Sequence, residues 1–198
     1  MFHGLQKPIV VTGTTGEPLT LAEAKEHLRI VSTSTGDDTD ITRMIRVATR
    51  QVEHLSGLQL MPATFRLRLD AFPTDVLDVP LPPLRGITSI GYVDPDGTTQ
   101  QMSSTNYEVD TDSMPGRVRP IYGQVWPSIR AQMNAVTIVY TNGYAASTDV
   151  PDAARHAIRF LVSQFYEMRE PVNVGNIVNE VPMTVKHLVE SFAVPRYA

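Results

Sequence analysis

The sequence predicts an α+β protein in which helices flank a central antiparallel β-domain, followed by an extended or helical C-terminal tail. Apolar residues recur at helical spacing near both ends of the chain, while the middle alternates apolar and polar residues between turn-forming residues. With 198 residues, 42% of them hydrophobic and 19% charged, the chain has the composition of a globular protein that buries a core.

The N-terminal elements are a short strand over 8–12 and a helix that begins after Thr20. The Thr20 side chain can cap the amide of Glu23, and Glu23 can reach back to Thr20, which is the capping-box arrangement. We expect this helix to run to about Arg29 and to give way to a flexible polar loop over 32–36.

A second, longer helix is predicted from Asp37 or Asp38 to Gly57. Acidic residues at its start suit N-capping and the positive end of the helix dipole, and glycine suits its C-terminal stop. The helix has a regular apolar stripe, which comprises Ile41, Met44, Ile45, Ala48, Val52 and Leu55.

Strands are predicted next, starting with an alternating segment over 65–70 that should be half buried. Three prolines between Val79 and Leu84 exclude an interior strand there and predict an extended crossing segment. The turn Asp94-Pro95-Asp96-Gly97 is the strongest hairpin signal in the chain. The strands expected around and after it are 87–93, 98–102, 107–110, 116–120 and 136–140.

The C-terminal part begins with a third helix after Val150-Pro151-Asp152, where proline in the first turn costs no hydrogen bond, and the helix ends before Pro171. A short helix is then expected over 183–192. We therefore divide the chain into four parts: an N-terminal helical part (1–60), a β-domain (61–149), a helix that packs back on the N-terminal helices (150–171), and a partner-binding tail (172–198).

No group of residues has the spacing of a catalytic, cofactor or metal site. The five histidines form no H-x-x-x-H or H-E-x-x-H pattern, and the acidic residues at 37–40 lack the glycine and distal glutamate of a calcium loop. There is no cysteine, no G-x-S-x-G elbow and no glycine-rich phosphate loop. We expect no enzymatic activity, no cofactor and no metal.

Charge and hydropathy exclude further classes. A net charge of −4 argues against a protein that grips nucleic acid over a broad surface. The N-terminus lacks a signal-peptide pattern and no apolar run approaches the ~20 residues of a membrane span, so a membrane role is not expected. The 14 arginines outnumber the 3 lysines, which is typical of interfaces but also of a GC-rich genome.

Two features are candidates for a subunit interface. Arg43, Arg46 and Arg50 lie opposite the apolar stripe of the second helix, as a solvated face or as a contact with the carboxylates of a neighbouring subunit. A phosphate contact is disfavoured by the acidic chain. Trp126, the only tryptophan, either closes the end of the β-domain core, which we favour, or anchors an interface.

The C-terminal tail is the candidate partner-binding segment. Val185, Leu188, Val189 and Phe192 form an apolar stripe that precedes Pro195-Arg196-Tyr197. Short amphipathic segments of this kind often become ordered only against a partner. The alternative is a helix that folds back on its own domain, and the residues alone favour neither.

The chain resembles the head–tail connector (adaptor) proteins of tailed phages, including those of phage-like gene transfer agents. The resemblance extends over most of the chain, from the opening helix to the tail. Its pieces are individually degenerate, and their order and spacing carry the match. They are Leu19-Thr20-Leu21-Ala22-Glu23-Ala24-Lys25, the Asp-rich start of the second helix, Leu81-Pro82-Pro83-Leu84 to Tyr92, Trp126-Pro127, Val139 to Tyr144 and Phe165 to Glu170.

The resemblance implies a structural adaptor in a virion or phage-like particle, assembled in the bacterial host cytoplasm. It implies a ring of twelve subunits under the portal protein that extends the DNA channel and receives the next neck or tail component, a stopper or tail terminator. DNA would pass through the lumen without sequence-specific binding. The C-terminal segment would contact the portal. The alternative is a stopper or tail-completion protein that does not touch the portal.

Overall fold

The computed structural model describes residues 7–168 and 183–194, which form two compact units. The strand unit comprises residues 7–15 and 62–144, and the helical unit comprises 16–61, 145–168 and 183–194. The N-terminal strand β1 (Ile9–Thr12) pairs with β2 (Ala63–Leu69), so it belongs with the strands and not with the helices that follow it in sequence. The predicted α+β fold class is confirmed.

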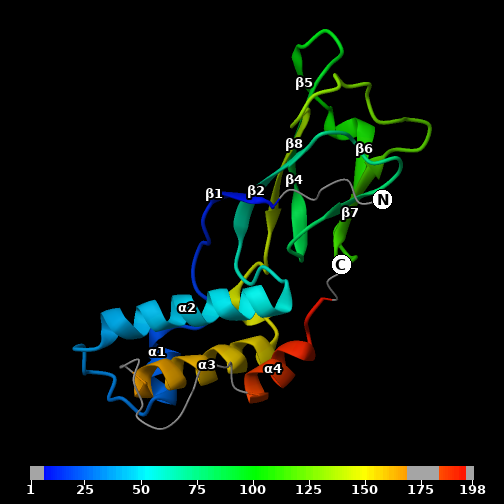
Figure 1. Ribbon diagram of the computed structural model, residues 1–198. Helices are drawn as coiled ribbons and strands as arrows, with labels where there is room; N and C mark the ends of the chain where they lie inside the picture. The colour runs from blue at the N-terminus through cyan, green and yellow to red at the C-terminus, as the bar shows by residue number, and fades with distance from the viewer. Residues whose placement is uncertain (1–6, 169–182, 195–198) are drawn as a thin grey trace. The chain divides into compact units, whose positions relative to one another are not determined.

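The strand unit holds two antiparallel sheets, whose strands are labelled in Figure 1. The larger sheet has the order β1-β2-β8-β4-β5, and the smaller has the order β3-β7-β6. The strands after β2 are β3 (Leu77–Val79), β4 (Leu84–Val93), β5 (Thr99–Gln101), β6 (Tyr107–Asp110), β7 (Gly116–Pro120) and β8 (Val136–Asn142), with a 3-10 turn, η1 (Ser104–Asn106), before β6.

The inner faces of the two sheets form the core of the strand unit. Alternation places Leu67, Ile138 and Tyr140 of the larger sheet inward, where they are fully buried, and their neighbours in sequence outward. Val79 and Val118 of the smaller sheet complete the same cluster. This is sheet-on-sheet packing, in which outward residues alternate with the core residues along each strand.

The hairpin and the proline segment follow the sequence expectations. The strands β4 and β5 pair across the predicted turn, where the Thr98 amide donates to the Asp94 carboxylate at 2.8 Å and Gly97 has a φ of 88°. No strand covers residues 80–83 in the part of the chain that the structure describes, as three prolines there require.

The helical unit contains α1 (Leu21–His27), α2 (Asp38–Ser56), α3 (Asp152–Glu167) and α4 (Met183–Glu190), with the 3-10 turn η2 (Ser147–Asp149) before α3. Helices α2 and α3 lie side by side, and α4 contacts both (Figure 1). Their apolar stripes face each other, which buries Ile41, Ile45 and Val52 of α2 together with Ile158 and Leu161 of α3.

The helix ends show which capping predictions were right. The capping box of α1 is confirmed, because the Glu23 amide donates to Thr20 Oγ1 at 3.2 Å and the Thr20 amide donates to Glu23 Oε2 at 2.9 Å. Gly57 ends α2 in a left-handed conformation, as expected. Asp37 occupies the N-cap position of α2 but caps no amide; it accepts a hydrogen bond from the Tyr166 hydroxyl at 2.8 Å.

Candidate assembly surfaces

The predicted partner-binding helix, α4, is packed on its own unit. Val185 and Val189 are 0% and 3% exposed, and Leu188 and Phe192 are half buried. The Val194 amide donates to the carbonyl of Ser56 at 3.1 Å, which ties the end of the segment to the end of α2. Of the two alternatives for this helix, the structure shows the folded-back one.

Because α4 packs on its own unit, only some of its apolar side chains keep surface that a partner could contact. Val185 and Val189 face α2 and α3 because helical spacing puts both on one side of α4, so they anchor the helix. Leu188 and Phe192 retain exposed surface. Pro195, Arg196 and Tyr197 lie outside the described residues.

The arginines of α2 are exposed, but each already has a carboxylate partner in its own unit. Their side chains are 71%, 65% and 57% exposed for Arg43, Arg46 and Arg50. The ion pairs are Arg43–Asp40 at 3.1 Å, Arg46–Glu17 at 3.3 Å and Arg50–Glu53 at 3.0 Å. Exposed pairs such as those of Arg43 and Arg46 contribute only about 0 to 1 kcal/mol to stability, so these two arginines remain available to a neighbour. The partner of Arg50, Glu53, has a side chain that is only 8% exposed.

Trp126 packs within the strand unit. Its ring stacks on Phe72 with centroids 4.6 Å apart, and its indole Nε1 donates to the carbonyl of Asp75 at 3.1 Å. Phe72 in turn meets Tyr92 edge to face. The half-buried Trp126 therefore lies against the core, which is the alternative that we favoured from the sequence.

Lys25 is a buried cation that the sequence did not single out. Its ammonium group donates to Asp38 Oδ1 at 2.8 Å, to the carbonyl of Ser32 at 3.1 Å and to the carbonyl of Ser34, and the residue is 5% exposed. These three acceptors match the three donors of an ammonium group. The polar loop expected to be flexible is thus held to the start of α2. No pattern in the sequence marks Lys25, because two of its three partners are backbone carbonyls and the third, Asp38, is 13 residues away.

Glu53 is a second buried charge that sequence reasoning missed. Its carboxylate accepts hydrogen bonds from Gln59 Nε2 at 2.8 Å and from the Leu60 amide at 3.0 Å, so it organises the turn after α2. Burial raises the pKa of Glu53, although the Leu60 amide and the Arg50 guanidinium oppose this shift.

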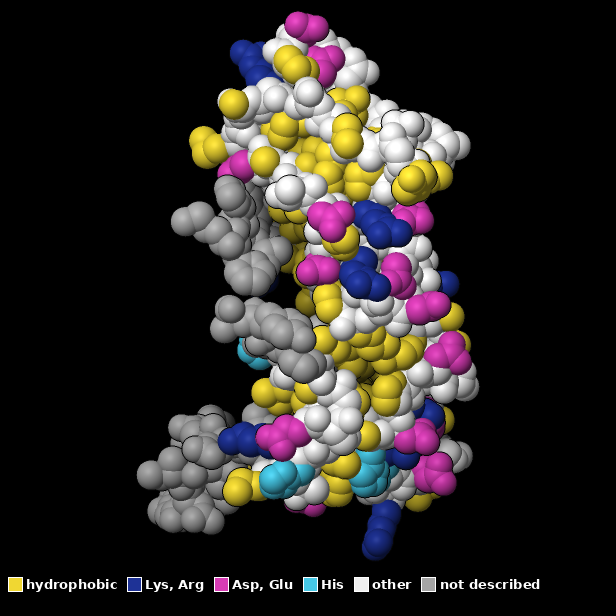
Figure 2. Space-filling model, turned by 90° about the vertical axis from the view of Figure 1, so that its right-hand side faces the viewer, with side chains coloured by type: hydrophobic (Ala, Val, Ile, Leu, Met, Phe, Trp, Pro, Cys, Tyr) yellow, Lys and Arg dark blue, Asp and Glu magenta, His cyan; other side chains and the backbone are white. Residues whose placement is uncertain are grey.

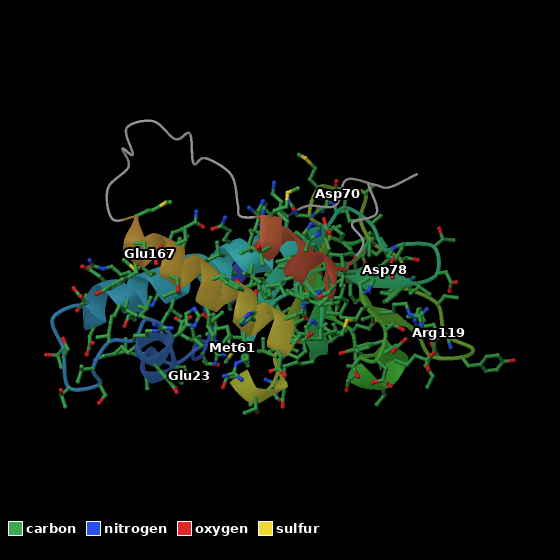
Figure 3. All side chains as sticks on the ribbon, turned by 90° about the horizontal axis from the view of Figure 1, so that it is seen from below. Glu23, Met61, Asp70, Asp78, Arg119 and Glu167 are labelled. Atoms are coloured by element: carbon green, nitrogen blue, oxygen red, sulfur yellow. The ribbon has the colours of Figure 1, made fainter. Side chains whose placement is uncertain are left out.

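Glu23 joins α1 to α3 and is labelled on α1 in Figure 3. Besides capping α1, its carboxylate accepts from Arg155 and from Arg159 NH2, the latter at 3.4 Å. Burial favours the neutral carboxyl, but the hydrogen bonds from Thr20 and the two nearby guanidiniums outweigh it, so the pKa of Glu23 lies below its usual value.

We expect Glu23→Gln to lower the free energy of unfolding at pH 7 by about 1 kcal/mol, a modest value because the site is partly exposed. A carboxylate with a lowered pKa contributes stability above its usual pKa and loses it as the pH falls through the folded-state value. The difference between the two proteins should therefore shrink at pH 3. Urea unfolding at both pH values measures this, with the exposed Glu26→Gln as control. A difference that does not change with pH would contradict the assignment.

The outward face of the smaller sheet carries alternating charges. Asp110 pairs with Arg117 at 2.6 Å, and Glu108 pairs with Arg119, in each case directly across β6 and β7. Hydrogen bonds from Ser113 and Arg117 hold the pKa of Asp110 well below its usual range. The sequence shows two acidic residues at alternate positions of one strand and two arginines at alternate positions of another. It does not show that they pair.

The sequence indicated no catalytic or metal site. Among the described residues, no group of three His, Cys, Asp or Glu side chains is placed to hold a metal ion. None of the described helices is long and apolar enough to cross a membrane.

Solved structures share this fold over the whole chain. A chain from the neck of an empty gene transfer agent particle, computed with C6 symmetry, is 25% identical, with 98% of each chain covered and a TM-score of 0.79. A chain from the virion of a native gene transfer agent particle is 25% identical, with 98% of each covered and a TM-score of 0.77. Another, from a native neck computed with C12 symmetry, has 22% identity, the same coverage and a TM-score of 0.76.

No protein-family model and no curated protein sequence matches the chain. The structural likeness confirms the resemblance to proteins of gene transfer agent particles, and places it with a chain of the particle neck.

Proposed function

We propose that this protein is a structural head–tail adaptor in the neck of a tailed phage or phage-like particle. The observation that carries the proposal is the full-length likeness, at 25% identity, to chains from the neck and virion of gene transfer agent particles. The surfaces fit an assembly role, because charged and half-buried apolar side chains surround two stable cores, and the sequence holds no motif for catalysis.

The adaptor forms a ring of twelve copies under the portal protein, extends the DNA channel and receives the next neck or tail component. The C12 and C6 symmetries of the two similar neck structures support a ring, and twelve is the smallest number of copies that permits both. DNA passes through the lumen without sequence-specific contacts, in keeping with the net charge of −4.

The tail contacts the portal through the residues that its own unit leaves free. Val185 and Val189 hold α4 on α2 and α3. Leu188 and Phe192, with part of their surface exposed, and the Pro195-Arg196-Tyr197 segment then make the contact. Arg43, Arg46 and Arg50 serve a neighbouring subunit through their exposed guanidiniums: Arg43 and Arg46 exchange their present carboxylate partners for those of the neighbour, while Arg50 keeps its buried partner Glu53.

Deletion of residues 195–198 together with Phe192→Ala should weaken binding to the purified portal by about tenfold or more, because it removes the free part of the tail and keeps the buried anchors. Binding is measured by co-purification and by titration. Val47→Ala, which truncates an exposed side chain of α2, is the control. Undiminished portal binding by the deleted protein would overturn the tail assignment.

A stopper or tail-completion protein is the alternative. In that case the protein binds a component of the phage tail. It does not bind the portal, whether or not its own C-terminal segment is present. Cryo-electron microscopy of the neck decides the wider question: density for this chain away from the particle axis would refute the neck assignment.

A further inference from the structure

The two outer faces of the strand unit differ in charge. Because the sheets pack through their inner faces, their outer faces point in opposite directions. We call seven of the outward residues of β2, β4 and β8 in the larger sheet the basic face: Arg66, Arg68, Ser89, Gly91, Thr137, Val139 and Thr141. We call the outward charged residues over and beside the smaller sheet the acidic face: Asp75, Asp78, Glu108, Asp110, Arg117 and Arg119.

The basic face contains two cations and no carboxylate. Register puts Arg66 opposite Val139 and Arg68 opposite Thr137, and none of the seven residues of this face is buried. The first carboxylate beyond β2, Asp70, accepts from the Asn134 amide at 2.7 Å. The basic face is therefore accessible and has a formal charge of +2, and Ile9 of β1, which is 51% exposed, lies beside it opposite Arg66.

The acidic face has four carboxylates and two guanidiniums, for a formal charge of −2. Figure 2 shows basic side chains in dark blue with acidic side chains in magenta on both sides of them. A pocket of about 320 Å³ lies among Glu108, Asp110, Arg117 and Arg119. Asp78 and Arg119 are labelled on this part of the chain in Figure 3. The face combines excess negative charge with a hollow.

Charges without a partner remain on both faces. Asp78 lies opposite Arg117 in register, yet makes no ion pair with any described residue, since Arg117 pairs with Asp110. Arg66 and Arg68 make no hydrogen bond or ion pair with the described residues, and the Nε atom of Arg66 is buried without an acceptor. The basic face thus has guanidiniums without carboxylate partners, and the acidic face has a carboxylate without a cationic partner.

We propose that neighbouring copies of this chain meet head to tail, with the basic face of one copy against the acidic face of the next. A contact between two different faces of the same chain generates a ring when the rotation closes, whereas a two-fold contact would put like charges together. Arg68 is exposed and long enough to enter the hollow, whose lining residues Arg117 and Arg119 have Asp78 and Asp75 as neighbours. This contact rests on the proposed ring function and specifies the surfaces that build it.

Cysteine cross-linking tests the contact directly, because the chain has no cysteine of its own. A chain carrying Arg68→Cys and Asp78→Cys cannot close the disulfide internally, since the two sites are on opposite faces. In particles under mild oxidation it should give a ladder of covalent multimers larger than a dimer. Each single variant should give dimers at most. The control pair, Arg68→Cys with Asp96→Cys, uses an exposed aspartate at the hairpin tip and should give no ladder.

Charge exchange gives an independent readout. We expect Arg68→Glu to lower incorporation into particles by about tenfold or more, because the contact then opposes like charges. Asp78→Arg should do the same, and the double variant Arg68→Glu/Asp78→Arg should restore most of the incorporation. Circular dichroism checks that each variant is folded.

The possible outcomes distinguish failure of the head-to-tail contact from failure of the proposed adaptor function. If the wild-type protein is incorporated as a ring but the cysteine pair cross-links no better than its control and charge exchange has no effect, the contact is wrong and the adaptor role stands. If the wild-type protein is absent from particles and forms no ring, both are wrong. A multimer ladder with charge rescue supports both.

Discussion

Replacing Lys25 by methionine should lower the free energy of unfolding by about 2 to 3 kcal/mol, because it leaves a partly buried carboxylate and two carbonyls without their donor. The estimate is below that for a fully buried pair since the Asp38 side chain is 28% exposed. Methionine fills similar space, so the loss reports on the ammonium group and not on packing. Denaturant unfolding measures it.

The same substitution should release the loop over 32–36. Amide hydrogen exchange there should become faster in Lys25→Met, while α2 and α3 keep their protection. Lys7→Met, at an exposed lysine, is the matched control and should change neither quantity. A Lys25→Met protein with wild-type stability and unchanged exchange would show that the three hydrogen bonds do not hold the loop.

Gly116→Ala should lower the free energy of unfolding by about 2 to 3 kcal/mol through overpacking. A Cβ at this position would lie 2.6 Å from Leu84 Cδ2 and 3.0 Å from Leu84 Cγ, and it would also contact the less mobile Leu84 Cβ. The strain therefore has to be relieved by moving β4 or β7, whose inner faces meet here. Thermal and denaturant unfolding measure the loss.

Gly86, which lies in β4 two residues after Leu84, provides the control. A Cβ at Gly86 would meet nothing within 4 Å, so Gly86→Ala should change stability by less than about 0.5 kcal/mol. The clash also predicts coupling: Gly116→Ala should cost less in a Leu84→Ala background, where the opposing side chain is shortened. Equal costs in both backgrounds would show that the Leu84 Cγ and Cδ2 atoms are not the obstacle, because alanine keeps only the Cβ.

The secondary structure was largely predictable, because it depends on local chemistry. The capping box at Thr20 and Glu23, the glycine at the end of α2 and the turn before β5 each act over a few residues, and all three are present. The exception is Asp37, whose side chain takes the Tyr166 hydroxyl in place of a helix amide. A partner from α3 cannot be inferred from residues near position 37.

The candidate surfaces were predicted less well, since they depend on which side chains meet. Helical spacing correctly put Val185 and Val189 on one face of α4, but it could not tell whether α4 would meet its own unit or a partner. Spacing also put Arg43, Arg46 and Arg50 on the exposed face of α2, but it could not reveal the carboxylate partner of Arg46, which is Glu17 and lies outside the helix. Both questions are decided by contacts between distant parts of the chain.

By itself, the sequence determined the α+β class, the order of the elements, the absence of a recognisable catalytic motif and the resemblance to connector proteins. Periodicity and turn chemistry are local, so one sequence suffices to read them. Only the tertiary structure decided that β1 joins the strand unit, that Lys25 holds the α1–α2 loop, and that the outer faces of the two sheets carry opposite charge. These features arise from strand pairing and burial between residues far apart in sequence, which local patterns do not record.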